Sequence, residues 1–202
     1  MGKKLLTVFS FVLFLHTAEG QKLNLQAGVR GDLTYSRING DGWSIGYKAG
    51  FNAGAFAEIK LNNTWSVQPE LAFSQRNIKV GNFKEFFASS ASEDPGQYVF
   101  LSYIILPVSV KYKVMDQLLI NAGVQYSYLI HADETLLRSG HAAFNMNDFG
   151  VLAGVEYVPS RVRLYARFYQ GLTDISKVNN LHDWNTIQIQ AGIGYVLFTE
   201  KK

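Results

Sequence analysis

The sequence predicts an all-β protein: an eight-stranded antiparallel up-and-down transmembrane β-barrel, preceded by a helical, cleavable signal peptide. Three observations support this prediction. Apolar and polar residues alternate with a period of two, charged residues keep to one of the two resulting faces, and long connections alternate with short ones. A period of two is typical of strands, because successive side chains of a strand point to opposite faces of its sheet.

The alternation is clearest in the arms of a predicted hairpin, 147–157 and 161–172, joined by Pro159 and Ser160. One face of each arm is apolar, while Arg163 and Arg167 lie on the other face of the second arm. A membrane barrel turns its apolar face to lipid and its charges to the lumen. A soluble, lipocalin-like barrel would need the two faces inverted, which the alternating connections do not favour.

Six further stretches alternate in the same way, and Pro69 and Pro107 lie within two of them. Because proline has no N–H to donate to a neighbouring strand, we expect a bulge or a missing hydrogen bond at each proline, or shorter strands there. Short periplasmic turns and long extracellular loops are typical of outer-membrane barrels. The six stretches are Leu23–Tyr35, Ile45–Leu61, Thr64–Arg76, Gln97–Lys113, Gln117–Ile130 and Thr186–Phe198.

The first twenty residues have the pattern of a secretory signal. Lys3 and Lys4 precede the apolar run Leu5–Leu15, and Ala18 and Gly20 place small residues before a cleavage site at Gln21. The run is too short to span a bilayer comfortably as an uncleaved anchor. We therefore expect a signal peptide over residues 1–20 and an outer-membrane barrel domain over residues 21–202.

Composition limits the possible functions. The chain is 48% hydrophobic and 14% aromatic, and it contains 18 glycines. It has no cysteine, so the fold has no disulfides. A net charge of +3 without a basic cluster gives no indication of nucleic-acid binding.

Charged residues on the predicted lumen face are expected to pair with one another, because buried charges need partners. The lumen of an eight-stranded barrel is narrow and filled by side chains. We therefore predict an ion-pair network that plugs the lumen, with a polar conduit or ligand pocket of basic surplus as the alternative. The predicted network consists of Arg30, Asp32, Lys48, Glu58, Glu70, Arg76, Lys111, Glu156, Arg163 and Arg167, with Lys60 and Lys113 on the same face.

Aromatic residues gather near the predicted strand ends and point outward. Aromatic side chains with a polar group are favoured at membrane–water interfaces, so we predict two girdles. Trp65, Tyr112, Tyr157 and Tyr195 form the periplasmic girdle, and Tyr35 and Tyr47 belong to the extracellular one.

Several stretches resemble the PorT-like outer-membrane β-barrel family of Bacteroidetes, whose members are commonly described as porin-family proteins. The resemblance implies an eight-stranded barrel in the cell outer membrane and no catalytic residues. The stretches include Gly54–Glu58, Ser66–Leu71, Tyr103–Tyr112, Asp148–Gly150 and Arg167–Thr173.

Catalytic and metal sites have little support in the sequence. His131, His141 and His182 fall in predicted extracellular loops, where a transition-metal site would require the loops to converge. Ser139 lies beside His141 without a fixed orienting group. We predict no metal, cofactor or enzymatic activity.

The predicted function is therefore that of a small, non-enzymatic outer-membrane barrel with a plugged lumen. It would have a structural or partner-binding role through its loops, including Glu85–Phe87, or its periplasmic rim. Its expected partners are outer-membrane lipid, the barrel assembly machinery and a protein at either end. The alternatives are a narrow porin or small-solute binding barrel, and a lipid-modifying outer-membrane enzyme.

Overall fold

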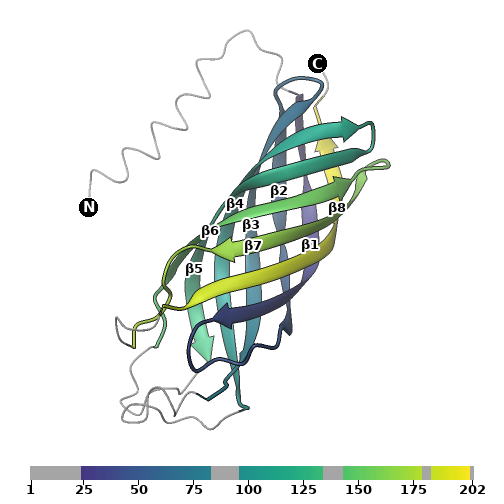
Figure 1. The fold of residues 1–202 in the computed structure, drawn as a ribbon. Helices are drawn as coiled ribbons and strands as arrows, with labels where there is room; N and C mark the ends of the chain where they lie inside the picture. Colours follow the sequence, from purple (N-terminus) through teal and green to yellow (C-terminus); the bar gives the residue numbers. More distant parts are fainter. Residues whose placement is uncertain (1–23, 83–95, 134–142, 179–182, 201–202) are drawn as a thin grey trace, which may run out of the picture.

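The computed structural model describes residues 24–82, 96–133, 143–178 and 183–200, and within them eight strands close into a barrel (Figure 1). Each strand pairs antiparallel with the next, and β8 closes the ring on β1. The strands are β1 (Asn24–Asn39), β2 (Lys48–Lys60), β3 (Trp65–Lys79), β4 (Tyr98–Met115), β5 (Leu118–Asp133), β6 (Asn147–Tyr157), β7 (Val162–Gly171) and β8 (Asn185–Thr199).

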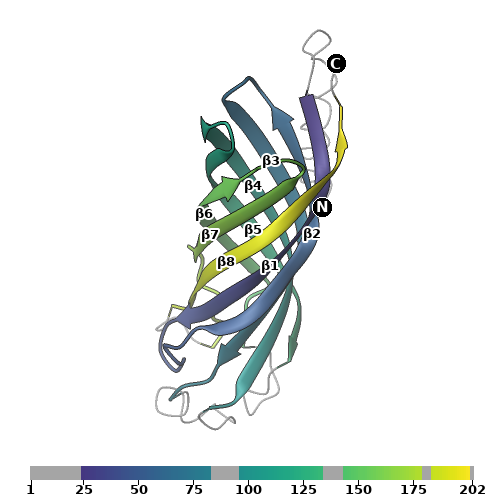
Figure 2. The ribbon, with the colours of Figure 1, turned by 90° about the vertical axis from the view of Figure 1, so that its right-hand side faces the viewer.

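The two ends of the barrel differ in their connections. The links 61–64, 116–117 and 158–161 are short and lie at one end, the turn end, where β1 also begins and β8 finishes (Figures 1 and 2). The links 40–47, 80–97, 134–146 and 172–184 are longer and belong to the opposite end, the loop end. The predicted barrel and its alternation of connections are confirmed. Within the described part of the chain, no helix is long and apolar enough to cross a bilayer.

The first connection differs from the prediction. β1 continues to Asn39, and β2 begins only at Lys48. Gly42 takes a positive φ of 87°, and Trp43 then forms an isolated bridge with Val80 beyond β3. Because this segment pairs with the end of β3, residues 45–47 do not extend β2 as the alternation predicted.

Both prolines interrupt the ladder without shortening their strands. The β2–β3 register omits the positions between Phe56–Glu70 and Ile59–Val67, which include Pro69. The β3–β4 register omits the two positions around Pro107, while the residues on either side keep their register. The strand register is therefore interrupted on one side of each proline, and the neighbouring pairs hold each strand in place.

The outer face of the barrel is apolar, and its inner face holds the charges. Leu33, Leu71 and Leu197 expose 64%, 56% and 62% of their surface. Arg30 and Glu70 are buried. This arrangement suits a lipid environment and excludes the soluble, lipocalin-like alternative.

Candidate functional site

The barrel interior contains equal numbers of buried cations and anions. Among the described residues, five basic and five acidic side chains are no more than 5% exposed. These are Arg30, Arg76, Lys111, Arg163 and Arg167, together with Asp32, Glu58, Glu70, Asp148 and Glu156.

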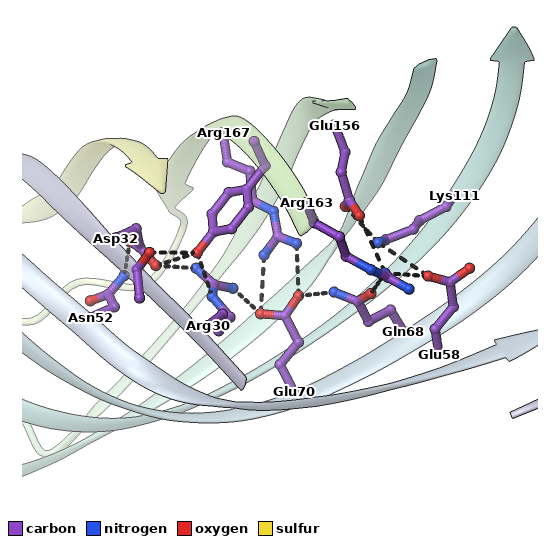
Figure 3. A network of polar contacts seen from close by, with 12 residues as sticks. Arg30, Asp32, Asn52, Glu58, Gln68, Glu70, Lys111, Glu156, Arg163 and Arg167 are labelled. Atoms are coloured by element: carbon purple, nitrogen blue, oxygen red, sulfur yellow. Dashed lines mark hydrogen bonds and ion pairs between the residues drawn. The ribbon is translucent and has the colours of Figure 1, made fainter. Parts of the chain in front are cut away.

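The group nearest the turn end combines Glu58, Lys111, Glu156 and Arg163, from β2, β4, β6 and β7. Lys111 Nζ lies 2.5 Å from Glu156 Oε2 and 3.5 Å from Glu58 Oε2. The Arg163 guanidinium forms ion pairs with both carboxylates, including one of 3.2 Å to Glu156. It also donates to Gln26 Oε1 at 2.6 Å. This turn-end group therefore connects four strands across the lumen (Figure 3).

The central group combines Arg30, Asp32, Glu70 and Arg167. Glu70 accepts from Arg167 through both carboxylate oxygens, at 2.8 and 3.0 Å, and also forms an ion pair with Arg30. Arg30 pairs with Asp32 at 2.5 Å and donates from Nε to Tyr165 Oη at 2.9 Å. The Tyr165 hydroxyl in turn donates to Asp32 at 2.8 Å. Every charge in this group has a charged partner of opposite sign.

A third set, the loop-end pair, consists of Arg76 and Asp148. Arg76 lies further along β3 than Glu70, and its Nη1 is 2.8 Å from Asp148 Oδ2. Its second terminal nitrogen donates to Ser127 Oγ at 2.9 Å. The guanidinium carbon lies 4.1 Å from the centre of the Tyr103 ring.

Gln68 joins the turn-end group to the central group. It donates to Glu70 at 2.6 Å and accepts from Arg163 at 3.0 Å, so the two groups form one network (Figure 3). Each set has as many positive as negative charges. This balance satisfies the buried charges without an external ion.

Among the described residues the packed interior has no basic surplus, whereas Lys60 and Lys113 line a hollow at the turn end. Lys48, predicted in the network, is the first residue of β2 and is only half buried; its Nζ lies 5.6 Å from the Tyr98 ring centre. Lys60 is exposed, and Lys113 pairs with Asp116 at 3.3 Å. These three lysines lie near strand ends, beyond the packed interior. Of the other nine residues predicted in the network, eight, Asp32 and Glu156 among them, lie buried in the joined turn-end and central groups, and Arg76 lies buried in the loop-end pair.

Three aromatic rings close the interior at the loop end. Trp43, Phe144 and Trp184 come from three different links, and all three are buried. Trp184 meets Trp43 edge-on at 5.0 Å between ring centres and Phe144 at 5.6 Å. We call these residues the aromatic plug. It is continuous with buried apolar residues that include Ile78 and Leu101.

A hollow of about 560 Å³ opens at the turn end. Its lining is mostly polar and includes Asn24, Thr64 and Ser160. Glu58 and Arg163 of the turn-end group also line it. Because these two residues are buried in the charge network, the hollow ends where that network begins.

The six predicted girdle aromatics all point outward, with exposed fractions between 37% and 51%. Trp65 and Tyr112 pair across β3 and β4, and their ring centres are 4.8 Å apart. Tyr47 lies in the first link, just before β2. The side chains at the turn end are Trp65, Tyr112, Tyr157 and Tyr195, and those at the loop end are Tyr35 and Tyr47.

The remaining candidates do not form a site in the described part of the chain. His131 lies within β5 and not in a loop, paired with Ser102. Glu85–Phe87, Ser139, His141 and His182 lie outside the described residues, as do residues 1–20. No group of three or more His, Cys, Asp or Glu side chains among the described residues is arranged to hold a metal ion.

Comparison with known proteins connects this architecture to a family. A model described as outer membrane protein beta-barrel domain matches residues 17–177. No curated protein matches the chain. Neisserial surface protein A has a similar structure, with a TM-score of 0.54 and 18% identity over 84% of this chain and 96% of that one.

The attachment invasion locus protein Ail of Yersinia pestis, solved with the heparin analogue sucrose octasulfate, is also similar. Its TM-score is 0.51 at 15% identity, covering 86% of this chain and 99% of that chain. At these identities the likeness shows the fold. Together with the family match and the lipid-facing apolar surface, it establishes that the chain belongs to the outer membrane protein β-barrel domain family and is an integral protein of the outer membrane.

Proposed function

We propose that this protein is a non-enzymatic outer-membrane barrel with a closed lumen, and that it acts through its two ends and its lipid-facing surface. The supporting observation is the succession of barriers along the interior. The turn-end group, the central group, the loop-end pair and the aromatic plug follow one another from the periplasmic side outward. Each barrier is made of buried, mutually paired side chains, so a transport pathway would have to disrupt all four.

Within its family, the chain would belong among the PorT-like proteins of Bacteroidetes. The stretches Tyr103–Tyr112 and Arg167–Thr173 support this placement. Cleavage after Gly20 would release the mature chain for the barrel assembly machinery. A protein partner would then meet either the extracellular loops or the periplasmic rim, where the turn-end hollow offers a polar surface.

Single-channel conductance in planar bilayers tests the closed lumen. We expect no steady conductance from folded protein, because the ion-pair groups leave no charge surplus and no continuous polar path. A large general porin, reconstituted in the same way, serves as the positive control, and gel mobility before and after boiling verifies folding. Reproducible steady conductance from the folded barrel would reject the proposal.

The turn-end hollow favours one alternative, a barrel that binds a small solute from the periplasmic side. Its volume of about 560 Å³ and its polar lining suit a small hydrophilic molecule. Saturable binding of a small hydrophilic solute added from the periplasmic side would support this alternative.

A further inference from the structure

The outer surface of β1 to β4 has a row of alternating cationic and aromatic side chains at the loop end. Ser36 pairs with Lys48, and Lys79 pairs with Tyr98. In the link just before β2, the Tyr47 ring lies under the Arg37 guanidinium. The row therefore runs across four neighbouring chain segments and consists of Arg37, Tyr47, Lys79 and Tyr98. Lys48 starts on the inner face of β2, opposite the buried Ser36, and its Nζ lies near the Tyr98 ring at the strand end.

Two of the cations here, Arg37 and Lys48, contact aromatic rings. The Arg37 guanidinium carbon lies 5.1 Å from the Tyr47 ring centre, and Lys48 Nζ lies 5.6 Å from that of Tyr98. Among the described residues, no ion pair joins Arg37, Lys48 or Lys79 to an acid. Within that same part of the chain, Arg37 Nε is buried without a hydrogen-bond partner. The row thus offers donors and positive charge to an anion.

The position of the row matches the level of lipid headgroups. Further from the loop end than the row, the same outer face exposes Leu33, Tyr35 and Phe51. These apolar side chains offer a surface to acyl chains, and the cations lie just beyond them. Basic residues at this depth attract the anionic groups of lipids.

A hollow of about 670 Å³ adjoins the row and shares Lys79 with it. Its lining includes the polar side chains of Ser44 and Asn82, the carboxylate of Asp41, and the apolar side chains of Trp43 and Ile45. Polar side chains beside an aromatic ring suit the hydroxyls and the ring face of a sugar. The hollow therefore gives room for a sugar beside the positive charges.

We propose that this surface binds the phosphorylated sugar headgroup of a glycolipid from the outer leaflet. Its phosphate would lie among Arg37, Lys48 and Lys79, its sugar in the adjoining hollow, and its acyl chains against Leu33 and Phe51. The three parts of such a lipid correspond to three adjacent parts of the barrel surface.

Native mass spectrometry of the detergent-solubilised full chain, titrated with diphosphorylated lipid A, tests this proposal. The test variant is Arg37→Gln/Lys48→Gln/Lys79→Gln. A matched control, Lys113→Gln/Arg161→Gln/Lys177→Gln, removes the same charge from exposed or half-buried positions outside the row. We expect about a hundredfold weaker binding for the test variant, roughly fivefold per cation, and less than a threefold change for the control.

Further ligands show which chemical group of lipid A is responsible for binding. Dephosphorylated lipid A should bind the wild-type chain as weakly as lipid A binds the test variant, and inorganic phosphate should not compete at millimolar concentration. Equal loss in both triple variants would overturn the proposal, since total charge would then explain binding. Equal affinity for phosphatidylglycerol and lipid A would overturn the glycolipid assignment.

Discussion

Replacing Arg76 with methionine is expected to lower the free energy of unfolding by about 3 to 5 kcal/mol. The change leaves the Asp148 carboxylate buried without the cation that lies 2.8 Å away in the native barrel. Asp148→Asn should have a similar effect, because it leaves the buried guanidinium unpaired. The double variant, Arg76→Met/Asp148→Asn, should lose far less than the sum of the two single variants.

Urea unfolding in lipid vesicles, followed by tryptophan fluorescence, measures this cycle. The exposed pair Lys113–Asp116 provides the matched control, since its charges are solvated and its removal should have little effect. Additive losses in the Arg76 and Asp148 variants would show that the two side chains do not depend on each other. Such additivity would contradict the claim that the opposite charges within each interior set stabilise one another.

Replacing Trp184 with alanine is expected to cost about 3 to 5 kcal/mol of unfolding free energy. Trp184 is fully buried and contacts both other rings of the aromatic plug, so its removal leaves a large cavity at the loop end. Trp184→Phe should retain much of this stability because a ring still fills part of the space.

The same urea titration measures this effect, with Trp65→Ala as the comparison. Trp65 is partly exposed at the turn end and packs edge-on against Tyr112, so its loss should cost less. Trp184→Ala should remain non-conducting, because the charged groups still fill the lumen below the aromatic plug. Wild-type stability of Trp184→Ala would show that the aromatic plug does not hold the loop end together.

Local sequence patterns predict much of this fold. Strand positions follow from the period of two, and the side on which Arg163 or Glu58 lies follows from the same alternation. Hairpin pairing then follows from the short turns. Local patterns do not predict which charges meet across the lumen. Arg163 and Glu58 are 105 positions apart, and their contact depends on the stagger of strands that are not sequence neighbours.

The aromatic plug could not be predicted by the same reasoning. Trp43, Phe144 and Trp184 lie in links, where no periodicity indicates which way a side chain points. The alternation puts Asp148 on the polar face of its strand, but its place near the start of β6 does not indicate a partner. Its contact with Arg76 joins strands β3 and β6, which do not pair with each other.

Accessibility of single cysteines in the folded barrel tests the closed interior most directly, because the native chain has none. Thr64→Cys places a thiol in the turn-end hollow, whereas Ser74→Cys and Ser109→Cys place thiols at fully buried interior positions. We expect a small charged thiol reagent to modify the Thr64 variant readily, and the other two only after boiling. Modification of the Ser74 or Ser109 variant at the Thr64 rate, in protein that still migrates as folded, would contradict a closed lumen.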